Sequence, residues 1–491
     1  MTIGGAPPPA GLGALEERLA QDLRWLNLPA KDWVPPRSVD GARVLDVAIV
    51  GGGLCGLAAA AALRRVGVFN IAIYDRAPEG KEGPWITFAR MDTLRTRKEA
   101  SGPALGVPSL TFRAWFEAQY GVEAWERMDK IPRTMWMEYL VWYRKILDLP
   151  VHNDTAVTAI VPRPDGLIAL SRTDSSGSQK IVARRVILAT GLDGLGGPTE
   201  PPIARTIDRH FWTHGSDMID FATLRGKRVG VVGAGASAMD NAATALEQGA
   251  ERVDLFIRRE RIPTTDKFSG VGSPGMVHGY YGLPTKLKWR YQYFGNLAQI
   301  PPPRPSTLRV SRHPNAYFHL GSPIFAVKQD GDSLVVTTPK GRYDVDFLIF
   351  TTGFGIDFSL RPELAAIAPY IRLWRDSFTP PDNERSEELA LSPDLSPDFT
   401  FREKVPGICP AVSHIACFAY PSVPSQGKLT SGIPSISDGA LRLARGLARS
   451  LFVEDGEQHF ADFMAYDTPE LLGDEYGDAD AILEKANHGQ R

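Results

Sequence analysis

Two glycine-rich hexapeptides are the clearest chemical features of this sequence. The first, Gly51-Gly52-Gly53-Leu54-Cys55-Gly56, follows a short apolar stretch typical of a buried strand and precedes an alanine-rich helical pattern. In a GxGxxG loop of this kind, Gly51 makes the tight turn after the strand and Gly53 lets the backbone approach a pyrophosphate. Gly56 lets the helix pack closely on the strand, and the helix N-terminus favours the anionic phosphates. The spacing therefore predicts a dinucleotide-binding site.

An acidic residue completes this first pattern. The next apolar stretch, 70–74, ends at Asp75, which lies 19 residues after Gly56. A carboxylate at the end of that strand accepts hydrogen bonds from ribose hydroxyl groups. Cys55 lies inside the loop, and we interpret it as a small packing residue rather than a nucleophile.

The second hexapeptide, which begins at Gly233, differs from the first at two points. Gly233 and Gly235 hold the first two glycine positions, but Ala238 holds the third, and the following strand ends in Arg258-Arg259 instead of an acidic residue. Guanidinium groups form charge-assisted, often bidentate, bonds to a 2′-phosphate, which a carboxylate would repel. The pattern favours NADPH over NADH. The alternative interpretation is that these arginines lie in an ordinary solvated turn.

Each loop belongs to one copy of a repeated order of elements. Both copies are expected to run strand, glycine loop, helix, strand, β-meander, strand. This repeat predicts an α/β fold with two Rossmann-like dinucleotide-binding domains, one for FAD and one for NADPH, each with a β-meander. The expected strands and meanders lie at 45–50, 70–74, 155–184 and 185–189 in the first copy, and at 227–232, 252–257, 322–345 and 347–351 in the second.

The FAD domain is expected to be discontinuous in sequence. A helix is also expected over 126–147, and a long surface excursion over 376–404. The expected segments are an N-terminal arm with an amphipathic helix (1–40), the first part of the FAD domain (41–215), the NADPH domain (216–353), the second part of the FAD domain (354–453) and an acidic C-terminal tail (454–491).

Composition excludes several other classes of function. The formal charge of -2 argues against a nucleic-acid-binding protein, and no stretch approaches the roughly 20 apolar residues of a membrane span. No signal for secretion is present, so we expect a cytoplasmic protein. The cysteines, Cys55, Cys409 and Cys417, form no CxxC pair, and the nine histidines form no HExxH motif. We therefore expect neither a redox dithiol nor a metal site.

With these loops, further motifs make the chain resemble the class B flavoprotein monooxygenases. This group includes flavin-containing, N-hydroxylating and Baeyer–Villiger monooxygenases. Gly83-Pro84-Trp85 resembles the GGxW motif of the family, and Ala189-Thr190-Gly191 and Thr351-Thr352-Gly353-Phe354 resemble its ATG-type strand ends. The resemblance covers roughly residues 44–450.

One family motif is incomplete here. His214 lies where the FxGxxxH fingerprint would end, but Asp208 and His210 hold the phenylalanine and glycine positions. The full Baeyer–Villiger signature is therefore missing. The resemblance implies that His214, the one candidate for a catalytic role, orders the hinge between domains and does not transfer protons. A purely structural linker histidine is the alternative.

The resemblance also implies two sets of cofactor-binding residues. A further loop, Gly427-Lys428-Leu429-Thr430-Ser431-Gly432, leads into a helix over 436–450 whose N-terminus is expected at the flavin pyrimidine edge. The alternative for this loop is a polar segment that only caps the helix. The expected FAD set is Gly51, Gly53, Gly56, Asp75, Arg76, Trp85, Val157, Thr190, Gly191 and Thr430, and the expected NADPH set is Gly233, Gly235, Ser237, Ala238, Arg258 and Arg259.

The reaction expected from this resemblance is oxygenation of a small molecule. In the family, NADPH reduces FAD, the reduced flavin adds O2 to form a C4a-(hydro)peroxide, and one oxygen atom passes to the substrate. An amine or sulfide is the expected substrate. Oxygenation of a ketone, and an NADPH oxidase or reductase without oxygen transfer, are the alternatives. The protein itself supplies positioning, dryness and electrostatics. No oligomeric state is predicted.

Overall fold

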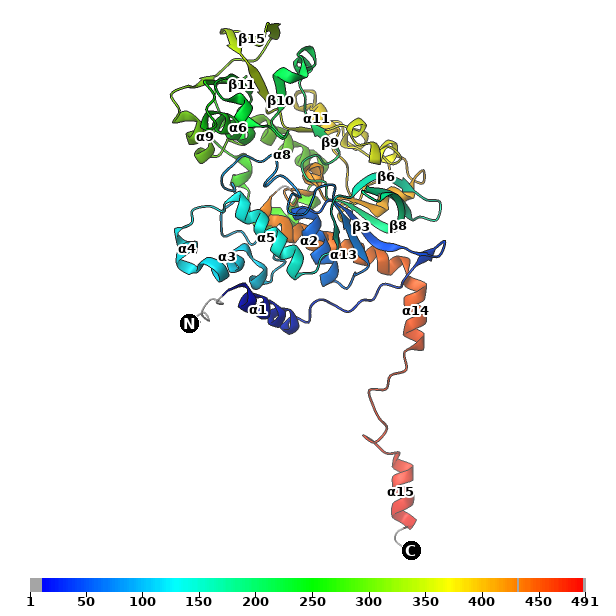
Figure 1. Cartoon of the computed structure of the whole chain (residues 1–491). Coiled ribbons are helices and arrows are strands. Elements are labelled where there is room, and N and C mark those ends of the chain that lie inside the picture. Colours follow the sequence, from blue (N-terminus) through cyan, green and yellow to red (C-terminus); the bar gives the residue numbers. More distant parts are fainter. Residues whose placement is uncertain (1–10, 431, 489–491) are drawn as a thin grey trace. The chain divides into compact units, whose positions relative to one another are not determined.

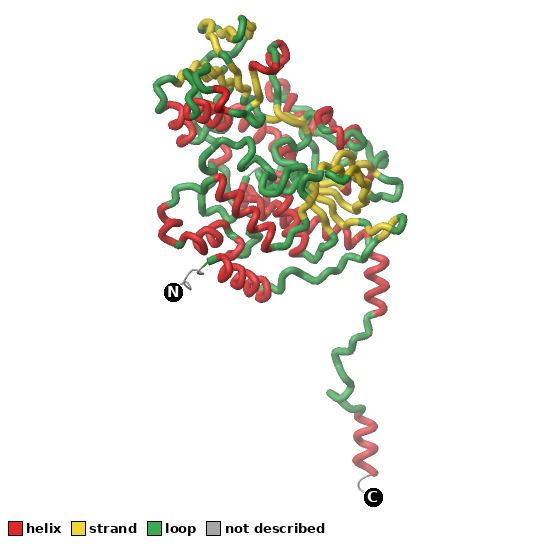
Figure 2. Tube along the Cα trace, in the orientation of Figure 1, coloured by secondary structure: helices red, strands yellow, loops and turns green. Residues whose placement is uncertain are grey.

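Two mainly parallel sheets organise the larger part of the chain (Figures 1 and 2). The computed structural model describes residues 11–430 and 432–488, and the chain divides into two units between Ala448 and Arg449. Both sheets lie in the first unit. The order of elements confirms the expected α/β fold with two Rossmann-like halves.

The first sheet holds the first glycine loop at the end of its strand β3 (Leu45–Val50). Its parallel strands run in the order β5, β4, β3, β8 and β19. The neighbours of β3 are β4 (Ile71–Tyr74) and β8 (Gly177–Leu188), with β5 (Val151–His152) and β19 (Ile415–Cys417) outside them. Because β19 comes from far along the chain, this half is built from discontinuous segments.

Strand β8 belongs to two layers at once. Its first part pairs antiparallel with β7 (Ile168–Asp174), which pairs with β6 (Ala156–Pro162), and its second part pairs parallel with β3. Ala183 faces Ile168 on one side and Leu45 on the other. Separate strands were expected for the end of the meander and for 185–189, and this expectation is wrong. Continuous pairing on both sides keeps the chain extended through the junction.

The second sheet is entirely parallel, in the order β10-β17-β11-β12-β13. Its first strand begins at Trp212, before the domain boundary expected at 216. The strands that cross between the two sheets, β9 and β18, pair with each other antiparallel. The bounds are β9 (Gly196–Pro198), β10 (Trp212–His214), β11 (Arg228–Val232), β12 (Arg252–Phe256), β13 (Ala316–His319), β17 (Phe347–Phe350) and β18 (Phe354–Ile356), with the meander β14 (Ala326–Asp330), β15 (Ser333–Thr338) and β16 (Gly341–Val345) and the hairpin β1 (Ser38–Val39) and β2 (Ala42–Arg43).

The helix expected over 126–147 begins only at Arg133, and a separate short helix ends before it. Helix α4 ends at Arg127, and α5 begins at Arg133 after Pro132, because proline disfavours helical conformation in the residue before it and lacks an N–H donor. The helices are α1 (Leu12–Trp25), α2 (Leu54–Arg65), α3 (Phe112–Tyr120), α4 (Val122–Arg127), α5 (Arg133–Ile146), α6 (Ala236–Glu247), α7 (Pro274–Gly279), α8 (Thr285–Ala298), α9 (Arg304–Ser311), α10 (Trp374–Ser377), α11 (Glu387–Ala390), α12 (Val423–Gln426), α13 (Ile436–Glu454), α14 (Gly456–Ala465) and α15 (Ala479–His488).

The N-terminal helix α1 packs against the first half by its leucine stripe. Leu15 and Leu19 are buried, and Asp22 and Glu16 on the same helix accept hydrogen bonds from Ser109 and Trp142. Across the described residues, none of the helices is long and apolar enough to cross a membrane.

The segment 376–404 is more than the surface excursion expected from its polar composition. Leu395, Phe399 and Phe401 are buried, and backbone bonds join Phe399 and Phe401 to Cys417 and Ile415 on β19. A few apolar residues among many polar ones are enough to anchor the segment on the core of the first sheet.

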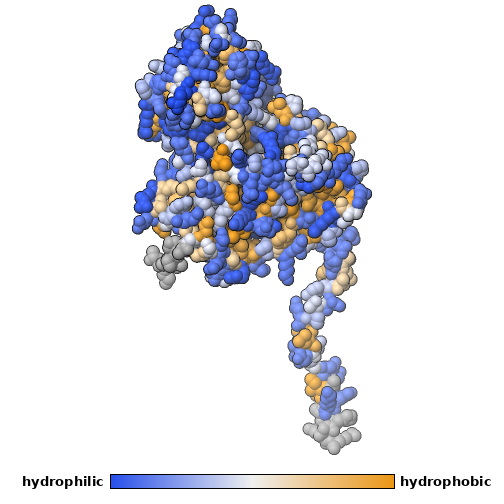
Figure 3. Space-filling model, in the orientation of Figure 1, coloured by the Kyte–Doolittle hydropathy of each residue, from blue (hydrophilic) through white to orange (hydrophobic). Residues whose placement is uncertain are grey.

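The second unit contains the end of α13 together with α14 and α15. Apolar side chains lie at its surface among hydrophilic ones, as Figure 3 shows, and Phe463 and Leu472 are 71% and 80% exposed. An acidic segment was expected here from residue 454 onward. The exposed apolar residues distinguish it from a purely polar tail.

Candidate functional site

Two glycines of the first glycine loop leave no space for a Cβ atom. Gly51 has a φ of 108°, and a Cβ built on it would lie 2.4 Å from the carbonyl oxygen of Ala189. A Cβ on Gly56 would lie 1.9 Å from the carbonyl oxygen of Gly51. Only glycine therefore fits at either position, and helix α2 begins in direct contact with the loop.

Gly53 differs from these two glycines because the space above it is open. Its φ is −74°, and the nearest atom to a Cβ built there is 3.9 Å away. It caps α2, whose first turn has no side-chain cap and no acidic residue. Free N–H groups at a helix N-terminus, beside open space, fit the pyrophosphate of a dinucleotide.

A cavity adjoins this open side of the loop. It lies between the loop and helix α5, and its wall includes Glu82, which is buried. The lining residues are Gly52, Gly53, Leu57, Glu82, Met137, Leu140, Val141 and Arg144.

Asp75 is fixed by two backbone donors. Its Oδ2 accepts a hydrogen bond from the N–H of Gly52 at 2.6 Å, and its Oδ1 accepts one from the N–H of Ala77 at 2.7 Å. Each carboxylate oxygen can accept more than one bond, so capacity remains for ribose hydroxyl groups. The neighbouring Arg76 is exposed and pairs with Asp193 at 2.9 Å.

A buried polar network beside the cavity was not found from the sequence. Glu82 accepts hydrogen bonds from Arg144 at 3.1 Å and from Asn153 at 2.6 Å. Asn153 also donates to the carbonyl of Ala77 at 3.0 Å. The network fixes the chain between Asp75 and the Gly83-Pro84-Trp85 turn. Its members are far apart in sequence, and no motif links them.

The structure places the other expected FAD residues around this loop or on the same half. Thr190 follows β8 and donates to the carbonyl of Gly194 at 3.0 Å, and Gly191 has a φ of 65°. The ring of Trp85 meets Trp136 edge to face at 6.2 Å. Val157 lies at the β-bulge of β6 and packs on the core of the first sheet.

The loop that begins at Gly427 lies beside the first turn of α2. The carbonyl of Thr430 accepts a hydrogen bond from the thiol of Cys55 at 3.5 Å, and its hydroxyl lies 2.9 Å from that of Ser422. Ser431 is outside the described residues. Burial raises the pKa of Cys55 to about 12, so its thiol stays protonated at neutral pH. This agrees with a packing role for Cys55.

The second glycine loop repeats the turn but not the close helix contact. Gly233 has a φ of 141°, and a Cβ on it would lie 2.3 Å from the hydroxyl of Thr351. No atom lies within 4 Å of a Cβ built on Gly235, which is the open position for a phosphate. Ala238 is fully buried at the third position, and Ser237 lies beside Asn241 at 3.2 Å.

The two arginines after β12 differ in their surroundings. Arg258 is exposed and makes no hydrogen bond or ion pair within the described part of the chain. Arg259 donates to the carbonyl of Leu297 at 2.9 Å. Arg258 is therefore free to meet an anionic group, whereas Arg259 also connects the strand end to helix α8.

His214 is buried at the end of β10. Its Nδ1 lies 2.7 Å from the hydroxyl of Ser216, and its ring meets Phe354 edge to face at 6.0 Å. Burial lowers its pKa. Its contacts are with the crossing segments between the two sheets, and neither glycine loop hydrogen-bonds to its ring.

Two arginines connect the segment after the Gly83-Pro84-Trp85 turn to the second half. Arg90 donates to the carbonyls of Gly215 at 3.1 Å and Asp217 at 2.6 Å. Arg309 on α9 donates to the carbonyl of Arg90 at 3.0 Å and pairs with Glu247 on α6 at 2.6 Å. These bonds hold the halves that carry the two loops in one arrangement.

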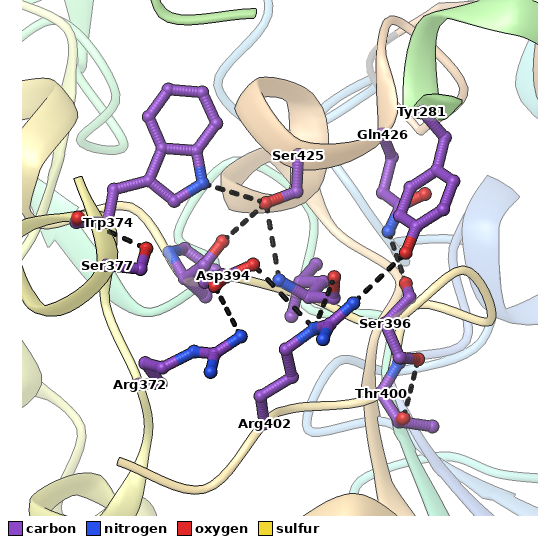
Figure 4. A network of polar contacts seen from close by, with 12 residues as sticks. Tyr281, Arg372, Trp374, Ser377, Asp394, Ser396, Thr400, Arg402, Ser425 and Gln426 are labelled. Atoms are coloured by element: carbon purple, nitrogen blue, oxygen red, sulfur yellow. Dashed lines mark hydrogen bonds and ion pairs between the residues drawn. The ribbon is translucent and has the colours of Figure 1, made fainter. Parts of the chain in front are cut away.

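The insertion between β12 and β13 covers the loop at Gly427. In the polar network of Figure 4, Tyr281 from this insertion accepts a hydrogen bond from Arg402 at 3.1 Å. Ser425 on α12 accepts one from the indole of Trp374 at 3.1 Å and donates to Pro393 at 2.7 Å. The network fixes α12 and the loop that follows it. Among residues 11–430 and 432–488, no cluster of His, Cys, Asp and Glu has metal-binding geometry.

Comparisons with known proteins agree with this geometry. A model of the pyridine nucleotide-disulphide oxidoreductase family matches residues 48–271. The chain is 39% identical over 466 residues to the FAD-dependent urate hydroxylase of Xanthomonas campestris pv. campestris, covering 94% of this chain and 98% of that protein.

Solved structures of two amino-acid hydroxylases share the fold. The ornithine N-hydroxylase of Kutzneria sp. 744, with reduced FAD, NADP+ and L-ornithine, has a TM-score of 0.63 at 18% identity, covering 83% of this chain and 99% of that one. The ornithine hydroxylase of Pseudomonas aeruginosa has a TM-score of 0.64 at 14% identity, covering 83% of this chain and 100% of that one.

Proposed function

The chain belongs to the same family of FAD-dependent hydroxylases as the urate hydroxylase, with the fold of flavin-dependent N-hydroxylases, and on this premise we propose that it hydroxylates urate or a closely related planar purine anion. It is an FAD-dependent monooxygenase that uses a nicotinamide coenzyme. The proposed reaction consumes one NADPH, one proton and one O2, and forms hydroxylated substrate, NADP+ and water.

The observation that carries this proposal is similarity along the whole chain. The identity of 39% extends over 466 residues, 94% of this chain and 98% of the urate hydroxylase, so it is not confined to the cofactor loops. A purine substrate takes the place of the amine or sulfide expected from the sequence, because the likeness to the ornithine hydroxylases supports the fold alone.

The residues of the chain supply binding and orientation. Gly53 and the uncapped start of α2 would hold the pyrophosphate of FAD, with Asp75 at the ribose, and Gly235 and Arg258 would hold NADPH. When bound, FAD accepts a hydride from the coenzyme and activates O2. Arg90 and Arg309 hold the two halves in one arrangement, so the residues that would bind FAD and NADPH keep a fixed relation to one another.

Reduction of a disulfide is disfavoured for this member of the family. All three cysteines are free, and burial raises the pKa of both Cys55 and Cys417 to about 12. A thiol with so high a pKa is a poor source of thiolate, the form that attacks disulfides. Cys409 belongs to no CxxC pair.

The test supplies the purified FAD-loaded protein with urate, NADPH and isotopically labelled O2. We expect one labelled oxygen atom in the product and nearly one NADPH consumed per urate. Quantitative hydrogen peroxide without labelled product would favour the oxidase alternative. Labelled product from an amine or sulfide, with urate unchanged, would show that the substrate is an amine or sulfide and not a purine.

A further inference from the structure

Lys428 is presented from a rigid turn beside the first glycine loop. The N–H of Leu429 donates to the carbonyl of Gly427 at 2.8 Å, which places Lys428 at the centre of a three-residue turn. Gly427 has a φ of 81°, and a Cβ on it would lie 3.2 Å from the buried side chain of Tyr280. Leu429 is buried. The next residue, Thr430, contacts Cys55 in the first turn of α2.

An aromatic ring contacts this lysine, and a second cation acts on it electrostatically. The Nζ of Lys428 lies 4.1 Å from the centroid of the Phe268 ring, which belongs to the insertion after β12. The guanidinium of Arg95, from the segment after the Gly83-Pro84-Trp85 turn, acts on Lys428 as a like charge. Lys428 therefore lies against the ring, and Arg95 adds a like charge from another part of the chain.

No carboxylate of the described chain forms an ion pair with either cation. Arg95 donates only to the carbonyl of Pro301, at 2.8 Å. Asp266, the acidic group with an attractive effect on Lys428, accepts a bond from the N–H of Phe268 at 3.1 Å. Burial and Arg95 lower the pKa of Lys428, so an anionic ligand placed here would stabilise its charged form.

We infer that Lys428, together with the ring of Phe268, forms the subsite that binds the anionic edge of a planar aromatic substrate. The inference rests on the proposed function for the identity of that substrate as urate. An ammonium group at the ring face supplies charge, and the aromatic ring supplies a flat surface on which a heterocycle can lie. A substrate held here would lie beside the loop that begins at Gly427, which contacts the first turn of α2. Lys428 would then determine specificity by selecting anionic substrates.

The test measures binding of two planar aromatic anions, urate and benzoate, to the oxidised FAD-loaded protein by equilibrium dialysis without NADPH. Lys428→Gln is expected to weaken binding by about 10- to 100-fold, because it removes a charge-assisted contact. Lys428→Arg is expected to restore most of the affinity. Lys267→Gln, which removes an exposed lysine next to Phe268, is the matched control and is expected to bind like the wild type.

The outcomes separate this inference from the proposed function. If benzoate binds through Lys428 but urate neither binds nor reacts, the proposed substrate is wrong and the anion subsite stands. If the wild type binds neither anion, or if Lys428→Gln binds both as tightly as the wild type with its FAD content unchanged, the subsite is overturned. Equal weakening in Lys428→Gln and Lys267→Gln would also overturn it, since the effect would then reflect general surface charge.

Discussion

At the third position of the glycine motif, the first loop has Gly56 and the second has Ala238, and the two helices meet their loops differently as a result. A methyl group at Gly56 would lie 1.9 Å from a backbone oxygen, whereas the methyl group of Ala238 is accommodated in a fully buried site. The strand ends differ as well, because Asp75 is bonded to its own loop while Arg258 has no partner in the described chain.

This difference separates a preformed site from an open one. In the first half, the residue expected to meet the ribose already holds the loop in place, which reduces the ordering that ligand binding requires. In the second half, the cation expected to meet the 2′-phosphate stays free in solvent. The first arrangement suits a resident cofactor, and the second suits a coenzyme that must enter and leave in each cycle.

Adding one methyl group at the third position tests the packing difference most severely. Gly56→Ala is expected to destabilise the protein by about 3 kcal/mol or more, because backbone atoms must move to relieve the overlap. The reciprocal change, Ala238→Gly, is expected to cost only about 1 kcal/mol from helix propensity. Thermal unfolding and bound-FAD content measure both variants. Equal destabilisation by the two would contradict the packing difference.

Filling the open glycine of each loop tests which ligand each loop binds. Gly53→Val and Gly235→Val are both expected to fold, since each position has ordinary φ and open space. Gly53→Val is expected to lose its flavin, seen as loss of the yellow absorbance. Gly235→Val is expected to keep FAD but to raise the KM for NADPH. Full flavin retention in a folded Gly53→Val protein would place FAD elsewhere.

Removing each arginine separately tests coenzyme selectivity. Arg258→Ala is expected to raise the KM for NADPH by about 10- to 100-fold and to leave that for NADH nearly unchanged, because it removes a charge-assisted contact with the 2′-phosphate. Arg259→Ala should have a smaller effect on selectivity, since Arg259 also bonds to Leu297. Steady-state kinetics with both coenzymes measure this. An equal effect on NADPH and NADH would mean that Arg258 serves stability alone.

The smallest expected effect is a dependence of protein stability on pH that arises from His214 in the second half. Burial lowers the pKa of His214, so the unfolded chain binds its proton more readily than the folded protein. Stability is therefore expected to fall as the pH decreases below about 6.5, the ordinary histidine value. His214→Gln should reduce this slope. The test is the melting temperature measured from neutral to mildly acidic pH. If His214→Gln shows the same pH dependence as the wild type, His214 does not cause the loss of stability.

The sequence predicted features whose signal is local. Each glycine loop carries its strand, turn and helix in one short segment, so both Rossmann-like halves were recognisable. The network around Glu82 and the contact of Lys428 with Phe268 were not, because they join residues from distant segments. The burial of Phe399 was also missed, because most residues of the segment 376–404 are polar and the whole segment was therefore expected at the surface.

Strand β8 connects the meander of the first half to its parallel strands, because Ala183 pairs with β7 on one side and with β3 on the other. Local unfolding of the meander is therefore coupled to the parallel strands. Around Ala183, the meander cannot separate without disturbing the strand that leads to the Ala189 turn and the loop at Gly51. The two layers are therefore expected to exchange their backbone amide hydrogens in one cooperative event, slowest near Ala183. A substitution that weakens the pairing of β6 with β7 is then expected to speed amide hydrogen exchange in the first glycine loop as well.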